Sequence, residues 1–272
     1  MKFESLGDWC KWLERNFSPD IMIPSLPVII RLDGNSFHQY TKGLQRPFDE
    51  NLTQLMIETT KFLVKETNAI IGQTSSDEIT LILYAPDRAS IYHEGKKQKI
   101  LSKLTGNCVS FFNEKRKELL PDHNKIANFD CRIYQTPTLE DAAAQLLWRE
   151  NDATKNSIYT LAWSMFSHGS LQNLNGNQLQ DKMMLEKQVN WNDLPVKYKR
   201  GTYIRREETT RNFTIEDLKT LPPKHKAHTD PSLVLTRHEI KDVELPILNK
   251  VGNLSDFIFN GATPIDREGN LL

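Results

Sequence analysis

The sequence predicts an α+β fold in which helices pack on one face of an antiparallel sheet. Short apolar runs that are typical of strands alternate with longer stretches whose apolar residues recur at helical spacing. Two of the apolar runs are separated only by a short polar turn, which predicts a hairpin. The resulting order, strand, helix, hairpin, helix, strand and further helices, favours an antiparallel sheet over a strictly alternating parallel one.

The first half of the chain supplies most of the predicted sheet. A buried strand begins at Val28, directly after Pro24 and Pro27. Asp49 begins a helix whose apolar residues recur at helical spacing. The predicted elements of this half, in order, are a helix over residues 5–17, a strand over 28–32, a helix over 49–66, the hairpin strands 69–73 and 79–84, a helix over 97–119 and a strand over 129–134.

The second half is predicted to be helical at first and polar later. Thr138 and Asp141 have the spacing of a capping box, which begins a helix that ends at Trp148. A second helix is predicted over 153–166. The polar block between the two helices is interpreted as a capped turn, or as a place that holds a nucleotide or an RNA end. One more short strand is predicted over 233–236.

Composition excludes several classes of protein. The chain has 35 Lys and Arg against 35 Asp and Glu, so it is not a globally basic nucleic-acid binder. Its 3 cysteines lack the spacing of a zinc site or a disulfide framework. No apolar run reaches the ~20 residues of a membrane span, and the N-terminus lacks the apolar core of a secretory signal. We therefore expect a soluble, cytoplasmic protein without membrane contacts.

Two acidic sites indicate the chemistry. Asp33 and Gly34 follow the first predicted strand, and Asp77 with Glu78 directly precedes the second strand of the hairpin. Carboxylates at the tips of neighbouring strands suit two Mg²⁺ ions against a triphosphate, because Mg²⁺ binds oxygen and takes few carboxylates. Each site alone is also typical of an ordinary turn, and only the two together favour a magnesium site for nucleotidyl transfer.

Other polar residues give weaker signals. The backbone at Asn35 and Ser36 could donate hydrogen bonds to phosphate, and the chain has no P-loop. Basic residues cluster over 96–103, 115–117 and 197–206. Each cluster alone is typical of a solvated helix face, whereas clusters that converge would form a track for RNA.

The segment from Arg31 to His38, with the sequence RLDGNSFH, resembles the opening motif of the tRNA-histidine guanylyltransferase superfamily. Further motifs of that family follow in its order, at Ser76–Glu78, Phe129–Arg132, Trp148–Asp152 and Asn190–Thr202. The resemblance covers roughly residues 5–205. It implies a polymerase-like palm with tRNA-binding helices over 1–200, which adds nucleotides in the 3′-to-5′ direction. After Gly201 the composition changes, with a charge run over 205–208 and two prolines at 222–223, so residues 201–272 are predicted to be a C-terminal extension or subdomain of unknown role.

The resemblance also implies roles for single residues. Two Mg²⁺ ions would be held by Asp33, Asp77 and the backbone carbonyl of Gly34, with Glu78 as a further catalytic acid. ATP, GTP or another nucleoside triphosphate would contact Asp33, Gly34, Asn35, Ser36, Phe37, His38, Arg46, Ser76 and Asp77. tRNA would contact Arg132, Arg149, Asp152, Asn156, Lys199 and Arg200. A homotetramer is implied as well.

One departure from the family pattern distinguishes its branches. Guanylyltransferases of tRNA-histidine carry His-Ile-Asn-Asn where this chain has Thr154 to Ser157, with the sequence TKNS. The latter resembles guanylyltransferase-like proteins, which repair truncated tRNA 5′ ends with a template. We therefore predict templated repair. The alternatives are untemplated addition of one G to tRNA-histidine, a palm-fold RNA-binding protein without catalysis, and a nucleotide cyclase with a similar palm.

Overall fold

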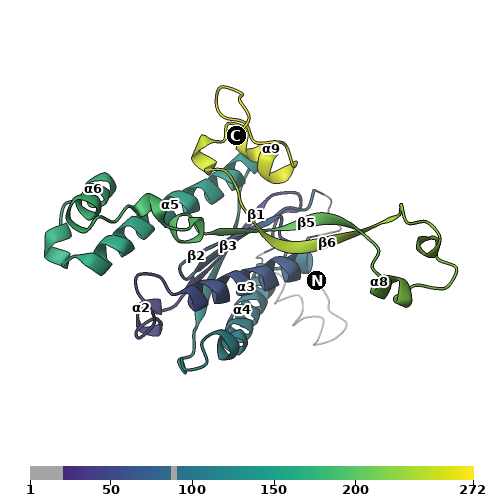
Figure 1. Cartoon of the computed structure of the whole chain (residues 1–272), viewed down its shortest axis with the longest axis horizontal. Coiled ribbons are helices and arrows are strands. Elements are labelled where there is room, and N and C mark those ends of the chain that lie inside the picture. The colour runs from purple at the N-terminus through teal and green to yellow at the C-terminus, as the bar shows by residue number, and fades with distance from the viewer. Residues whose placement is uncertain (1–20, 87–90) are drawn as a thin grey trace, which may run out of the picture.

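The computed structural model describes residues 21–86 and 91–272 and is built on a six-stranded sheet (Figure 1). The strand order is β4-β1-β3-β2-β5-β6, and every neighbouring pair is antiparallel. This arrangement confirms the predicted α+β class. The strands are β1 (Val28–Gly34), β2 (Ile71–Ser75), β3 (Glu78–Leu83), β4 (Phe129–Gln135), β5 (Thr202–Asn212) and β6 (Val234–Val243).

Four helices of more than two turns lie in the part of the chain that the structure describes: α3 (Glu50–Thr67), α4 (Lys97–Leu119), α5 (Leu139–Met165) and α6 (Gly176–Lys187). The first three pack on the sheet, and α6 packs on the C-terminal half of α5. The helix predicted over 5–17 lies outside the described residues. No helix within residues 21–86 and 91–272 is long and apolar enough to cross a membrane. Shorter helical segments are α2 (Phe37–Tyr40), α7 (Val196–Lys199), α8 (Ile215–Thr220), α9 (Leu254–Phe259) and the 3₁₀ turns Tyr92–Gly95, His168–Leu171, Trp191–Asp193, Lys226–His228 and Leu248–Lys250.

One face of the sheet packs against α3 and α4. Alternate residues of β1 point to this face, so Ile30 and Leu32 are fully buried there together with Leu81 of β3. The buried residues of α3 recur at helical spacing, and the helix begins at Asp49, whose carboxylate accepts a hydrogen bond from the Leu52 backbone N–H. The resulting core fixes the tips of β1 and β3, where the acids lie.

The opposite face is covered as well, which corrects the expectation that the helices pack on one face only. Ile29 of β1 and Ile82 of β3 are buried against Ala142 and Leu146 of α5 and against Ile258 of α9 (Figure 1). The sheet is therefore a middle layer between two helical layers. The apolar run of β1 is continuous because both of its faces lie in a core.

A single helix replaces the two that were predicted over 139–148 and 153–166. Helix α5 is 27 residues long and runs through the polar block without a break. It begins at Thr138, whose hydroxyl accepts from the Asp141 N–H, as the capping spacing predicts. No glycine or proline interrupts the block, and Glu150 within it is buried at 1% exposure. The interpretation of the block as a capped turn is therefore wrong.

The strands β5 and β6 form a long ribbon that extends from the sheet beyond the helical layers (Figure 1). Strand β5 was not predicted, and the strand expected over 233–236 is the beginning of the longer β6. Only Tyr203 and Ile204 of β5 are buried. Residues 201–272 thus contribute two strands to the common sheet and α9 to its second helical layer.

Candidate functional site

Three acidic residues lie side by side on neighbouring strands, near the ends of these strands. Asp33 near the end of β1 lies opposite Glu78 of β3 and opposite Asp130 of β4. Residues opposite each other in an antiparallel pair point to the same face, so these three carboxylates share the face that α5 covers. The Gly34 N–H donates to the Asp77 carbonyl at 3.1 Å, which ties the end of β1 to the β2–β3 turn.

The β2–β3 turn places Asp77 beside Asp33. Ser75 and Glu78 close the hairpin, and Ser76 takes a positive φ of 55°. The Ser76 hydroxyl donates to Asp77 Oδ1 at 2.8 Å. Burial raises the pKa of Asp77, and the nearby charge of Asp33 raises it further. The charges of the two aspartates thus repel each other, and the Asp77 carboxylate is partly desolvated.

These two acids fit a divalent cation. Within the described residues, no Lys or Arg forms an ion pair with Asp33 or Asp77, and no cluster of three or more acidic, His or Cys side chains could hold a metal alone. With water and substrate phosphate, the two carboxylates and the Gly34 carbonyl would make the oxygen-rich, incomplete protein site that Mg²⁺ prefers. The cation would also relieve the repulsion between the two aspartates.

Replacing Asp77 with asparagine tests this electrostatic reading without measuring activity. A pKa raised above its usual 3.8 means that the folded protein binds the proton more tightly, so wild-type stability decreases as pH rises through that range. We expect D77N to be more stable than wild type at pH 7 and to lose this advantage in acid. Thermal unfolding across pH measures it. Added Mg²⁺ should raise the Tm of wild type only, and a D77N protein less stable than wild type at neutral pH would contradict the reading.

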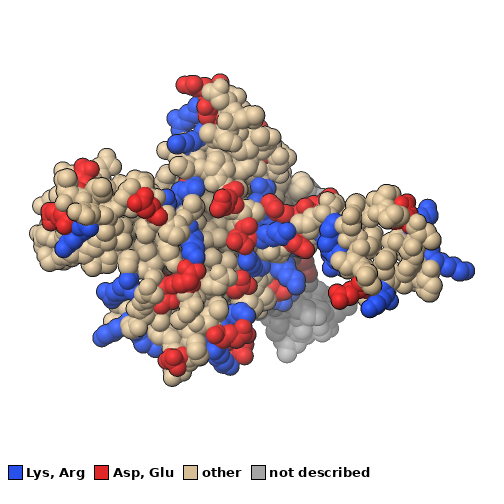
Figure 2. Space-filling model, viewed as in Figure 1, with Lys and Arg blue, Asp and Glu red and all other residues tan. Residues whose placement is uncertain are grey.

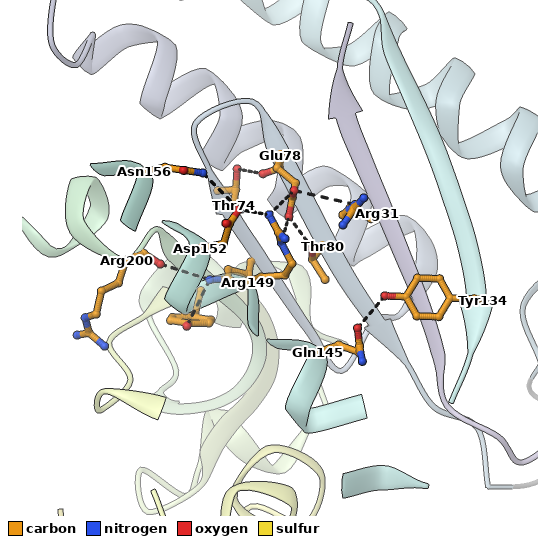
Figure 3. A network of polar contacts seen from close by, with 12 residues as sticks. Arg31, Thr74, Glu78, Thr80, Tyr134, Gln145, Arg149, Asp152, Asn156 and Arg200 are labelled. Atoms are coloured by element: carbon orange, nitrogen blue, oxygen red, sulfur yellow. Dashed lines mark hydrogen bonds and ion pairs between the residues drawn. The ribbon is translucent and has the colours of Figure 1, made fainter. Parts of the chain in front are cut away.

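Glu78 differs from the two aspartates because it already has a cationic partner (Figure 3). Arg149 of α5 donates through Nε to Glu78 Oε1 at 2.6 Å and through Nη2 to Oε2 at 2.8 Å. The same Nη2 donates to Asp152 at 2.8 Å. Burial raises the pKa of Glu78, and the Arg149 charge opposes that rise. Its carboxylate is therefore held by an internal ion pair, and its role in metal binding stays a prediction.

Arg31 and Trp148 extend this network. The Arg31 Nε lies 4.0 Å from Glu78 Oε2, and both Arg31 and Arg149 lie over the Trp148 ring, at 5.7 and 4.4 Å from its centroid. Asn156 donates to the Asp152 carboxylate at 3.3 Å. Sequence reasoning gave Arg31 no role, although it directly precedes Leu32 and Asp33 in the motif. Its position two residues before Asp33 on one strand puts both side chains on the same face.

The segment predicted to bind the triphosphate follows β1. The Asn35 N–H donates to the Asn128 carbonyl at 2.8 Å, and Ser36 takes a φ of 53° before α2. The Phe37 side chain is buried and stacks on Tyr40 with ring centroids 4.7 Å apart. A Cβ at Gly34 would lie 2.2 Å from the Phe37 ring, so glycine is required there. Phe37 can therefore face a nucleotide only through its backbone, whereas the side chains of His38 and Arg46 are exposed.

The residues predicted to bind tRNA differ in exposure and in their partners. Arg149 is 13% exposed and Arg200 is 15% exposed, and each forms an ion pair with a glutamate. Asp152 and Asn156 belong to the Arg149 network. Arg132 on β4 is exposed, with Asp130 Oδ1 at 3.9 Å from its Nε. Lys199 donates to the Asn192 carbonyl at 2.6 Å and lies over the Trp191 ring.

Glu150 joins α5 to the C-terminal part of the chain. Its carboxylate accepts from the Tyr203 hydroxyl at 2.6 Å, from Arg200 at 3.2 Å and from the Leu248 N–H at 2.9 Å. Sequence reasoning gave Glu150 no role. The signal was an acid in the apolar stripe of the helix, four residues after Leu146.

Comparisons with known proteins agree with this geometry. The profile of the family described as Thg1, tRNAHis guanylyltransferase, matches residues 9–137. The tRNA(His) guanylyltransferase of Saccharomyces cerevisiae is 27% identical over 210 residues, which are 69% of this chain and 86% of that protein. An uncharacterised protein of Acanthamoeba polyphaga mimivirus is 27% identical over 230 residues, covering 75% of this chain and 78% of that protein.

Solved structures extend the similarity to nearly the whole chain. A bacterial tRNA(His) guanylyltransferase-like protein in complex with ATP aligns with a TM-score of 0.75 and 34% identity, covering 94% of this chain and 99% of that one. The corresponding structure in complex with GTP aligns with a TM-score of 0.71. The sheet described above is the palm of these structures. The chain therefore belongs to the tRNA(His) guanylyltransferase (Thg1) family of nucleotidyltransferases.

Proposed function

We propose that this protein adds nucleotides in the 3′-to-5′ direction to the 5′ ends of truncated tRNA, with the opposing strand as template. The observation that carries the proposal is the pair Asp33 and Asp77, two carboxylates without a cationic partner among the described residues, beside a third acid that Arg149 holds. Two-metal nucleotidyl transfer needs such a pair at the edge of an open site. The bacterial relatives bind ATP and GTP, which supports nucleoside triphosphates as substrates.

In this mechanism each group of residues has one task. Asp33, Asp77 and the Gly34 carbonyl would hold two Mg²⁺ ions, and Ser76 orients Asp77 through its hydroxyl. When bound, Mg²⁺ supplies a lowered pKa for an attacking hydroxyl and neutralises charge on a leaving phosphate. Glu78 and Arg149 keep the acidic row in place. The Asn35 N–H is occupied by the Asn128 carbonyl, so the backbone from Ser36 to His38 and the Arg46 guanidinium would bind the triphosphate of the incoming nucleotide.

The bond changes follow from the substrates. The 3′-hydroxyl oxygen of the incoming nucleotide attacks the phosphorus at the tRNA 5′ end, and a phosphodiester bond forms. Pyrophosphate leaves from a 5′-triphosphate end. A 5′-monophosphate end must first be adenylylated by ATP, and AMP then leaves. Base pairing with the opposing strand selects the nucleotide, so the protein needs to recognise the shape and backbone of tRNA.

The charge distribution supports recognition by a few local contacts. Figure 2 shows Lys and Arg interspersed with Asp and Glu over the visible face rather than gathered into one basic track. Of the predicted tRNA contacts, Arg132 is exposed and Lys199 is partly exposed, whereas Arg149 and Arg200 belong to internal networks. We propose that the first two contact the RNA backbone directly. A homotetramer and a cytoplasmic location stay predictions.

The C-terminal half of α5 favours repair over addition of a single untemplated G. Ser157, the last residue of the TKNS segment, is 4% exposed and accepts from the Trp191 indole N–H at 3.0 Å. This position is an asparagine in the guanylyltransferase motif, and here it is committed to packing. In structural alignments the identity is 34% with a guanylyltransferase-like protein and 24% with the yeast guanylyltransferase, which supports the same branch.

The test uses 5′-triphosphorylated tRNA that lacks its first nucleotide, with Mg²⁺ and each nucleoside triphosphate separately. We expect incorporation only of the nucleotide that is complementary to the opposing base, and the preference should change when that base is changed. Addition of G opposite every base would support guanylylation of tRNA(His) instead. No incorporation together with intact tRNA binding would indicate a binding protein, and turnover of nucleotide without RNA would indicate a cyclase.

A further inference from the structure

The loop between α4 and β4 contacts the segment that is proposed to bind the triphosphate. Lys125 lies in this loop with an exposed side chain, yet its ammonium group is occupied. It donates to the backbone carbonyl oxygens of Gln39, of Tyr40 at 3.0 Å and of Lys42 at 2.9 Å. An ammonium group has three hydrogens to donate. All three therefore bind carbonyls at the C-terminal end of α2.

The loop that carries Lys125 is itself fixed to α4. The Asn113 side chain donates to the Ala127 carbonyl at 2.9 Å and accepts from the Ala127 N–H at 2.9 Å. Arg116, three residues further along α4, donates to the His123 carbonyl. Because α4 packs against the sheet in the hydrophobic core, these contacts fix the position of the loop that carries Lys125.

The same loop also contacts the beginning of the segment. The Asn128 carbonyl accepts from the Asn35 N–H at 2.8 Å. The ring of His123 lies against Tyr40, with centroids 4.6 Å apart. Residues 123–128 thus hold both ends of residues 35–42, and Arg46 follows only four residues after the last carbonyl that Lys125 binds.

We propose that Lys125 is a positioning residue for nucleotide binding. It sets the course of residues 35–46 so that their backbone and the Arg46 guanidinium meet the triphosphate, and it does not contact the nucleotide itself. Among the described residues no carboxylate pairs with Lys125. Its three partners are backbone carbonyls, so it fixes the conformation of the backbone. The inference rests on the proposed function, because it assumes that this segment binds the triphosphate.

The test compares K125M, K125R and the control K117M in the full chain. Methionine keeps the aliphatic stem and removes the donors, whereas arginine keeps the charge and can still donate to carbonyls. Lys117 is a matched control because it lies on α4, is 61% exposed and binds only Glu114 in the described part of the chain. Equilibrium binding of ATP and GTP, nucleotide KM and kcat, tRNA binding and Tm are measured for each variant.

We expect K125M to raise the Kd and KM for nucleotides roughly tenfold, the effect of about one or two lost charged hydrogen bonds. Its kcat and tRNA affinity should stay within about twofold of wild type. K125R should recover most of the nucleotide affinity, and K117M should match wild type throughout. Loss of kcat and tRNA binding together with KM would indicate general misfolding and overturn the inference, as would an unchanged nucleotide Kd in K125M.

The two proposals fail in different ways. A wild-type protein that binds nucleotides but never incorporates them would refute the proposed function, while weaker nucleotide binding by K125M would still support the role of Lys125. Normal templated incorporation together with an unchanged nucleotide KM in K125M would leave the function intact and refute the positioning role alone.

Discussion

Replacing Asp33 with asparagine is expected to lower the rate of nucleotide addition by roughly a thousandfold or more, because the metal site supplies several kcal/mol of transition-state stabilisation. The adenylylation of a 5′-monophosphate end should be lost in parallel, since both steps use the same site. Asp33 is partly exposed and accepts no hydrogen bond within the described residues, so the fold should not depend on its charge. Single-turnover incorporation into 5′-triphosphorylated tRNA measures the effect.

Asp130 offers the matched control for Asp33. It lies opposite Asp33 on β4, on the same face of the sheet, and has Arg132 at 3.9 Å. We expect D130N to lower the rate less than about tenfold, since local charge without metal ligation contributes little at a partly exposed site. Comparable losses in D33N and D130N would show that the charge of the whole row matters, and that Asp33 is not specifically a ligand.

Replacing Glu150 with alanine is expected to cost about 3–5 kcal/mol of the free energy of unfolding. The change leaves the largely buried Arg200 guanidinium without its carboxylate and removes the acceptor of the Tyr203 hydroxyl. Three parts of the chain, α5, β5 and the segment before α9, meet at this one side chain. Equilibrium unfolding in urea measures the loss.

Two further variants separate the causes. E150Q keeps the volume and one acceptor but removes the charge, so its loss should lie between those of wild type and E150A. N151A changes the next residue of the same helix, which is exposed, and should stay within about 0.5 kcal/mol of wild type. If E150A loses less than about 1 kcal/mol of the free energy of unfolding, water replaces the carboxylate and the network does not hold the three parts of the chain together.

Local patterns in the sequence predicted the elements that position the acidic residues. The strand from Val28, the helix from Asp49 and the hairpin around Ser76 carry their own boundary signals, a proline, a cap and a polar turn. The continuous apolar run of β1 also contained the evidence for two covering layers. An antiparallel strand with one exposed face would alternate, whereas Val28, Ile29 and Ile30 do not.

Other features depend on contacts that a local pattern does not contain. Most of β5 is exposed, and its strand conformation comes from pairing with β6, so residues from Arg205 to Asn212 show no apolar alternation. The sequence indicated that Glu78 supports a site. It could not indicate that Arg149, 71 residues later, is the partner, because that pairing depends on how α5 crosses the sheet. For the same reason Lys125 gave no signal.

The two-residue turn at Ser76 and Asp77 limits which insertions and deletions the chain can accept. Side chains alternate along a strand, so one residue inserted or deleted between Ser75 and Glu78 would turn β3 over relative to β1. Ile79 would then face Arg149, and Glu78 would point into the apolar core under α3 and α4. The turn can therefore tolerate substitutions of its residues far better than any change in their number. Insertions and deletions in this family should accumulate elsewhere, as on the exposed tip of the β5–β6 ribbon.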